Sequence, residues 1–221
     1  WLIGLIAMVT MIAGNVAALH QTNAQRMLAY SSIAHSGFLL VGILVANNWG
    51  TYSILFYATV YLAMNLAAFW LIKLFEEHTG SRNIPDYRGL GLRVPLLGLA
   101  MLLVMAALTG LPPTAGFTAK LFIFSSLWDH YQQTQEPQLL LVLVVGLFNT
   151  VIALFYYLKI PYYLFFKNAS EVSESPVLPT SDYSSQILGK FGMILLIIPL
   201  LVLFFKADWL LAIINKIISV L

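Results

Sequence analysis

One lysine lies in apolar sequence directly after a run of prolines and glycines, "LTGLPPTAGFTAKLFIF", in which the lysine is Lys120. Pro112 and Pro113 remove two backbone donors and clash with the preceding helical turn. Gly110 and Gly116 tolerate bends. Backbone groups freed at membrane depth persist only where protein or water satisfies them, so the run predicts two half-helices that meet at a polar cavity.

Lys120 follows that break by one to two helical turns. A lysine at the centre of a bilayer costs about 2.5–3.5 kcal/mol on insertion scales, and it is seldom found there without a role. A low dielectric disfavours the charged amine, which suits it to take up and release protons. The alternative is that Lys120 extends to the membrane surface from the end of a half-helix.

A second polar cluster, "AYSSIAHSGF", contains His35. Ser31 and His35 are four residues apart and share one helix face, and Ser32 and Ser36 repeat the spacing one residue later. Imidazole has an unperturbed pKa near 6.5 and can relay protons, with the serines holding water. The alternative is a histidine hydrogen-bonded between helices, with serines as interhelical donors.

Further polar residues inside the apolar stretches favour structural roles. Hydrogen bonds between helices are expected for Asn15, Asn65, Asn149 and Thr150. Tyr57, Tyr61 and Asn65 are spaced by four and could line a wet face. An aromatic belt near a membrane surface, around a lysine that reaches that surface, is expected for Tyr156, Tyr157, Tyr162, Tyr163 and Lys159.

The composition sets the class of protein. Of 221 residues 60% are hydrophobic and only 9% charged, against about 25% charged in soluble domains, so this is an integral membrane protein. The net charge of +2 gives no argument for a nucleic-acid partner, and the absence of cysteine excludes thiolate metal sites. The sequence has no phosphate-binding glycine loop, no paired histidines at metal-ligand spacing and no nucleophile elbow. We expect no metal, no bound cofactor and no covalent catalysis in this chain.

The elements that position these residues are membrane-spanning helices of about 20 residues. The expected spans are 2–19, 28–46, 52–74, 94–128, 138–158 and 186–205. A continuous helix over 94–128 would be about 52 Å long, too long for a hydrocarbon core of about 30 Å, so this span is the broken one. The fold class is an all-α polytopic membrane protein with about six transmembrane helices, one of them broken, plus a C-terminal amphipathic helix.

The C-terminal stretch "ADWLLAIINKIISVL" carries one polar stripe, formed by Asp208, Ala212, Asn215, Lys216 and Ser219. At 15 residues it is short for a span. It either lies in the membrane plane as an interfacial helix or packs the last span against a neighbour. The chain begins at Trp1 without a basic leader, which indicates a fragment whose N-terminal part is missing.

Lysine and arginine define the orientation, because cytoplasmic loops collect them. If the broken element crosses once, one side holds Arg26, Lys73, Arg82, Arg88, Arg93, Lys159, Lys167 and Lys190. The other side holds only Lys206 and Lys216. The basic side is then cytoplasmic; two crossings by the broken element would weaken this bias.

Two stretches, "QTNAQRMLAYSSIAHSGF" (21–38) and "ALTGLPPTAGFTAKLFIF" (107–124), resemble hallmark stretches of the antiporter-like membrane subunits of respiratory complex I. "YATVYLAMNLAAF", "DYRGLGLRVPLLGL" and "ALFYYLKIPYYLFF" fit as well. The resemblance implies fourteen helices containing two inverted five-helix repeats. Residues 1–166 would be the second repeat, 167–185 a cytoplasmic linker, and 186–221 the last helix with an interfacial tail.

By this resemblance Lys120 matches the family's proton-exchanging lysine of the second broken helix, and His35 a histidine of the central hydrophilic axis. Two features favour the subunit N branch: position 120 is lysine rather than glutamate, and the sequence ends soon after the short amphipathic tail. Gln25 departs from the family pattern, in which a lysine is common. The family's remaining key groups, a glutamate and two lysines, belong to the first repeat.

The implied function is proton translocation in the bacterial inner membrane, driven by redox chemistry elsewhere in the complex, where NADH, FMN, iron–sulfur clusters and quinone are bound. The implied partners are other membrane subunits and the lipid bilayer. Two alternatives stay open. Subunits of multi-component sodium/proton antiporters and membrane-bound hydrogenases share these motifs, and a structural scaffold would need the polar groups only as contacts between helices.

Overall fold

The structure, a computed structural model, describes residues 1–167 and 183–219, and this part is helical with no strand. In chain order the elements are α1 (Leu2–Leu19), α2 (Ala24–Val45), α3 (Asn48–Thr79), the short 3-10 helix η1 (Ile84–Tyr87), α4 (Leu90–Arg93), α5 (Pro95–Thr109), α6 (Ala115–Thr134), α7 (Pro137–Phe166), α8 (Tyr183–Phe205) and α9 (Ala207–Ile218). The all-α polytopic fold expected from the sequence is confirmed. The predicted linker falls mostly on residues 168–182, outside the described ranges.

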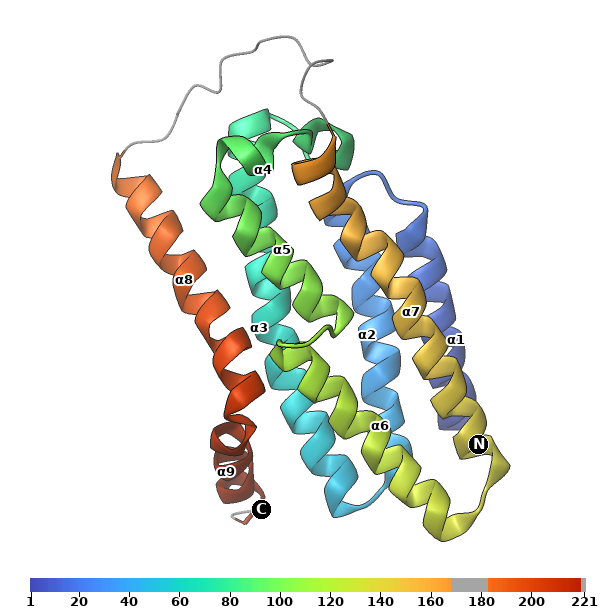
Figure 1. Cartoon of the computed structure of the whole chain (residues 1–221). Coiled ribbons are helices and arrows are strands. Elements are labelled where there is room, and N and C mark those ends of the chain that lie inside the picture. The colour runs from blue at the N-terminus through green and yellow to red at the C-terminus, as the bar shows by residue number, and fades with distance from the viewer. Residues whose placement is uncertain (168–182, 220–221) are drawn as a thin grey trace.

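Four helices, α1, α2, α3 and α7, are long and apolar enough to cross a membrane. Helix α5 is apolar but has only 15 residues. Figure 1 shows α5 running from the α4 end to the middle of the bundle and α6 continuing to the opposite end. The two half-helices therefore make one crossing, as the orientation argument required.

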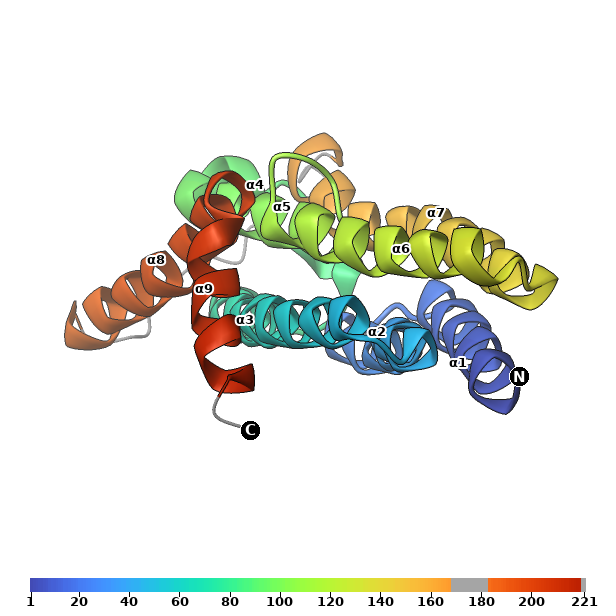
Figure 2. The same ribbon diagram turned by 90° about the horizontal axis from the view of Figure 1, so that it is seen from below.

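The long helices form two layers. Seen from below, α1, α2 and α3 lie in one row and α5, α6 and α7 in a second, with α8 beside them (Figure 2). Helix α2 contacts α6 and α7 across the layers, and α3 contacts α5 and α6. Residues on the facing sides of α2, α3, α6 and α7 thus meet at the centre of the bundle.

Helix α3 is longer than the sequence suggested. The expected span ended at 74, with Glu76, Glu77 and His78 in a loop, but these residues occupy the last turn of α3. The helix ends at Gly80, whose φ of +69° is the left-handed conformation that closes many helices. The prediction placed the boundary too early because it followed apolarity, whereas the backbone stop signal lies at the glycine.

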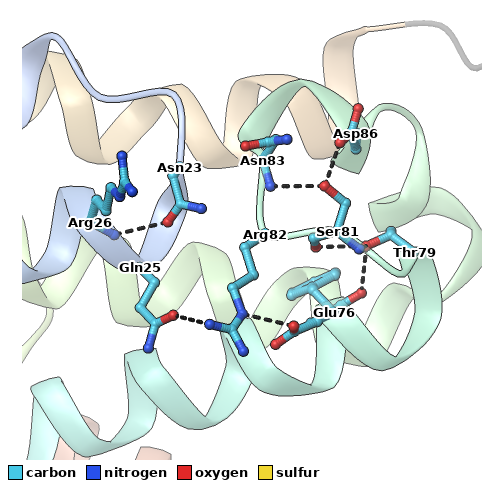
Figure 3. A network of polar contacts seen from close by, with 10 residues as sticks. Asn23, Gln25, Arg26, Glu76, Thr79, Ser81, Arg82, Asn83 and Asp86 are labelled. Atoms are coloured by element: carbon cyan, nitrogen blue, oxygen red, sulfur yellow. Dashed lines mark hydrogen bonds and ion pairs between the residues drawn. The ribbon is translucent and has the colours of Figure 1, made fainter.

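A polar network at the basic end ties the start of α2 to the end of α3 (Figure 3). Asn23 caps α2 by accepting from the Arg26 amide, and the Ala24 amide donates to the Arg82 carbonyl at 2.9 Å. The Arg82 side chain donates to Gln25 at 2.6 Å and pairs with Glu76 at 2.7 Å, and this bond to Glu76 raises the pKa of Arg82. The network thus links the start of α2 to the end of α3 and the segment that follows it.

Helix α9 follows α8 with a bend of 92°. Leu210 and Ile214 are buried against the bundle, and the Tyr52 hydroxyl of α3 donates to the Asn215 side chain. Trp209 and Ile213 are exposed. The tail is therefore helical and partly packed on α3, while its placement in the plane of the membrane stays a prediction.

Candidate functional site

The break between α5 and α6 is built by Gly110 and the two prolines. Gly110 takes a φ of +87°, and its amide donates to the Ala106 and Ala107 carbonyls at 3.0 Å. A side chain there would be strained, since L residues rarely adopt this conformation. Pro112 and Pro113 fall in the connection between the half-helices, as predicted.

Gly116 has a different role from the one the sequence suggested. It is the second residue of α6 and not part of a bend. A Cβ atom at this position would lie 1.8 Å from the Ala107 carbonyl oxygen, far inside van der Waals contact. Gly116 therefore lets the start of α6 pass close to the end of α5.

Lys120 points back at the break. Its side chain is only 5% exposed, and Nζ donates to the Thr109 carbonyl at 2.7 Å and to the Leu108 carbonyl at 3.4 Å. The last carbonyls of a helix have no partner within it and carry its negative dipole end, so an amine here is stabilised. The alternative in which Lys120 extends to the membrane surface is wrong.

His35 lies in α2 at the centre of the bundle and is 2% exposed. Its Nδ1 lies 2.7 Å from the Tyr57 hydroxyl of α3, and its Nε2 lies 3.0 Å from the Tyr157 hydroxyl of α7. The Tyr61 ring stacks on the imidazole at 4.5 Å between centroids. Both ring nitrogens therefore have a partner that can donate or accept a proton.

Phe38 lies against both candidate proton carriers. Its ring centroid is 5.1 Å from Lys120 Nζ, a cation–π distance, and 6.2 Å from the His35 ring centroid. No hydrogen bond joins His35 to Lys120 among the described residues. The structure thus brings the two groups to the same phenyl ring, not into direct contact.

Ser31 and Ser32 precede His35 by one turn of α2, and their hydroxyls donate within that helix. Both hydroxyls donate to the Leu28 carbonyl of their own helix, at 2.7 and 3.0 Å. Their expected role in holding water stays a prediction.

The sequence argument missed the tyrosines of α7. It assigned Tyr156 and Tyr157 to an aromatic belt, but both are fully buried, and the Tyr156 hydroxyl donates to Asn15 at 2.8 Å. Their buried polar role could have been inferred from their distance from the end of α7, nine or more residues before Phe166. Half-exposed Tyr162 is compatible with the belt.

The asparagines divide into two groups. Asn15 of α1 and Asn149 of α7 bond to each other, so the expected contact between helices is confirmed. Asn65 donates to Tyr61 and Thr150 to the Gly146 carbonyl, each within its own helix, and among the described residues neither side chain bonds to another helix. Within residues 1–167 and 183–219 no group of three or more His, Asp or Glu side chains could hold a metal ion.

Comparisons with known proteins give matches over most of the chain. The model of the family described as "NADH:quinone oxidoreductase/Mrp antiporter, TM" matches residues 1–153. A relative named NADH-quinone oxidoreductase subunit N 2, from Chloroherpeton thalassium, is 41% identical over 174 residues, which cover 79% of this chain and 33% of the relative. The chain therefore spans about a third of that protein's length.

Solved structures share the fold. A chain of respiratory complex I from Thermus thermophilus with bound aureothin aligns with a TM-score of 0.71 at 29% identity, covering 95% of this chain and 44% of that one. A chain of the Mrp complex from Dietzia sp. DQ12-45-1b aligns with a TM-score of 0.80 at 19% identity, covering 96% of this chain and 45% of that one. The second likeness concerns the fold alone.

Proposed function

Since the chain belongs to the NADH:quinone oxidoreductase/Mrp antiporter family of transmembrane subunits, we propose that it forms a proton-translocating part of subunit N of a bacterial respiratory complex I. The chain itself carries no redox step in this proposal. It moves protons, and NADH oxidation and quinone reduction occur in other subunits, where FMN and the iron–sulfur clusters are held.

The observation that carries the proposal is the buried amine at the helix break. Lys120 Nζ bonds to two carbonyls at the end of α5, and among the lysine and arginine side chains that the structure describes no other is buried. A charge that costs about 2.5–3.5 kcal/mol at this depth is rare unless the protein uses it. The carbonyl ends and the Phe38 ring stabilise the ammonium without the neutralising carboxylate of an ion pair.

In this proposal Lys120 takes up a proton from the central axis and releases it toward the side opposite the basic loops. His35 supplies the proton through its two hydroxyl neighbours. Phe38 lies against both carriers and no hydrogen bond joins them among the described residues, so the transfer needs water or a movement of side chains between them. Free energy released by redox chemistry elsewhere in the complex drives this proton transfer.

The proposed partners are the other membrane subunits of the complex and the lipid bilayer, and the proposed location is the bacterial inner membrane. The apolar exposed faces support this setting. On α1 they comprise Ile6, Val9, Ile12 and Val16, and on α7 Leu147, Phe148, Val151 and Phe155.

The proposal is tested by replacing Lys120 in the full-length subunit within the assembled complex. We expect Lys120→Ala to lower the rate of proton pumping in membrane vesicles at least about tenfold, about 1.4 kcal/mol in barrier height. NADH:quinone turnover measured on the same vesicles shows whether redox chemistry slows with it. Pumping at the full proton-to-electron ratio in the assembled variant would make Lys120 a structural residue.

Lys159 offers a matched control. Its Nζ also donates to a backbone carbonyl, that of Gln21 at 2.9 Å. Lys159 lies toward the C-terminal end of α7, near the basic end of the bundle and away from the break between α5 and α6. We expect Lys159→Ala to retain pumping. Equal losses in the two variants would indicate a general effect of removing an amine–carbonyl contact.

A sodium/proton antiporter subunit is a second candidate, because the family description covers Mrp antiporters as well. It differs in its energy source. Proton release driven by a sodium gradient, without NADH or quinone, would favour the antiporter, and release that needs NADH oxidation would favour complex I.

A further inference from the structure

The Phe38 ring provides the aromatic contact of the buried amine. Phe38 belongs to α2 and is 2% exposed, and its ring centroid lies 5.1 Å from Lys120 Nζ on α6. The attraction between a cation and a phenyl ring acts over the ring face, so its strength depends on how the ring is turned. The residues that orient Phe38 therefore bear on Lys120.

The end of α5 restricts the lysine independently of Phe38. Nζ donates to the Thr109 carbonyl at 2.7 Å. The side-chain stem passes close to Gly110, where an added Cβ atom would lie 2.8 Å from Lys120 Cδ and 3.4 Å from Cε. The stem is thus held in place, and the ring orientation is the variable part of the contact.

Phe124 on α6 makes an edge-to-face contact with Phe38. The two ring centroids are 6.0 Å apart and the ring planes meet at 83°, the arrangement that aromatic pairs favour. The contacts of Phe38 with His35 and Tyr57 are tilted instead, at 6.2 and 6.3 Å. Turning the Phe38 ring would break the edge-to-face geometry, so Phe124 limits its rotation.

Gly146 on α7 provides the space for this ring pair. A Cβ atom at Gly146 would lie 2.8 Å from Phe124 Cε1 and 3.4 Å from Phe124 Cζ, and it would also reach Phe38 Cε1 at 3.8 Å. The first distance is too short for any real Cβ contact, so a side chain here would displace the Phe124 ring. The position of Phe124 therefore depends on the surface of α7.

We infer that Gly146 and Phe124 are positioning residues for Lys120: the space at Gly146 seats the Phe124 ring, and Phe124 holds the face of Phe38 against the ammonium. The contacts run from α7 through α6 and α2 and return to α6 at the amine. They are contacts between rings, separate from the hydroxyl contacts of His35.

The arrangement gives α7 an influence on the proton carrier, a consequence that rests on the proposed function. A movement of α7 against α6 displaces Phe124, and the Phe38 face then turns relative to the amine. The cation–π attraction weakens when the cation no longer lies over the face. The ammonium is then held less firmly at the end of α5.

The test is proton-detected solid-state NMR of the full-length subunit in lipid vesicles, with carbon-13 and nitrogen-15 in the lysine side chains. The signals of Lys120 are those lost in Lys120→Arg. Protons over the face of a phenyl ring are shielded by its electrons, so we expect the ammonium and ε-methylene protons of Lys120 to move to higher frequency in Phe38→Leu. Unmoved signals would overturn the inference at its last contact.

Phe124→Leu and Gly146→Ala test the positioning role. The shift seen in Phe38→Leu defines complete loss of the ring contact. We expect most of this shift in Phe124→Leu, which removes the edge-to-face contact, and in Gly146→Ala, which displaces the Phe124 ring. If one variant fails to fold, the other decides, and signals at the wild-type position would refute the positioning role.

A double variant separates the route through Phe38 from a direct effect, because Phe124 follows Lys120 by one turn of α6. If Phe124 acts through Phe38, the variant Phe38→Leu/Phe124→Leu should show the same Lys120 signals as Phe38→Leu alone. A further shift of similar size in the double variant would mean that Phe124 acts on the amine directly, which contradicts the inference.

Phe122→Leu is the matched control. Phe122 is also a half-buried phenylalanine of α6, but its ring contacts Phe56 at 4.9 Å and Trp49 at 5.6 Å. The Lys120 signals should stay at the wild-type position, and a shift as large as that of Phe124→Leu would contradict the inference. The readout is separate from transport, so normal pumping in Lys120→Ala would refute the proposed function and leave this test standing.

Discussion

At the scale of single residues, Tyr157 and Tyr61 both contact the His35 ring, but only one can exchange a proton with it. The Tyr157 hydroxyl lies 3.0 Å from Nε2, whereas Tyr61 presents its ring face. Both are tyrosines in spans and cannot be told apart by composition. Their roles differ because a proton moves along a hydrogen bond and not across a stacked face.

Removing each hydroxyl separates these roles. We expect Tyr157→Phe to lower the rate of proton pumping at least about tenfold, because Nε2 of His35 loses its hydroxyl partner and a barrier of about 1.4 kcal/mol or more is added. Tyr61→Phe should pump at close to the wild-type rate. Pumping assays on vesicles containing the assembled complex measure both, and equal rates for the two variants would remove Tyr157 from the path.

At the scale of elements, the two half-helices depend on a close contact that only glycine permits. The Ala107 carbonyl occupies the space that a side chain at Gly116 would need. This contact places Lys120, one turn later in α6, within reach of the end of α5. The position of the amine is therefore a property of how the two half-helices pack.

Gly116→Val should destabilise the protein by about 1–3 kcal/mol or more, the usual cost of overpacking, because α5 and α6 must separate. Thermal unfolding of the purified full-length subunit measures the effect. Gly192→Ala in α8 is the control, since its added Cβ meets only ordinary contacts with Trp70 at 3.5 Å and beyond. A Gly116→Val protein as stable as Gly192→Ala would refute the close-packing argument.

At the scale of the whole molecule, the single crossing of the broken element decides the orientation. The loops before α2 and before α5 and the C-terminal end of α7 then lie at one end of the bundle (Figure 1). Lys206 and Lys216 lie at the other end. The positive-inside rule predicts that the first end faces the cytoplasm.

Cysteine labelling tests this orientation, helped by the lack of native cysteine in the chain. Glu77 and Gln133 are exposed at opposite ends of the bundle. In a full-length subunit free of other cysteines, we expect a membrane-impermeant thiol reagent added outside intact cells to label Gln133→Cys and not Glu77→Cys. Labelling of Glu77→Cys alone would reverse the orientation. Labelling of both variants would refute it.

The sequence by itself determined the features that depend on local chemistry. Apolar length predicted the spans, with α1 at Leu2–Leu19 as expected. Pro112 and Pro113 predicted the break because two successive prolines remove two backbone donors and clash with the preceding turn, whereas the single Pro161 is accommodated inside α7. The position of Lys120 in apolar sequence after the break, together with the family motifs, favoured a buried amine, which the structure confirms, while its proton-carrying role stays a prediction.

Only the tertiary structure decided which groups meet. His35 and Tyr157 are 122 residues apart, and Asn15 and Asn149 are 134 apart, so no spacing rule could pair them. Tyr156 and Tyr157 were misassigned for the same reason, since a tyrosine near the end of a span is equally typical of a surface belt. Hydrophobic periodicity sets which helix face is buried, but the partner on that face depends on how helices distant in sequence pack together.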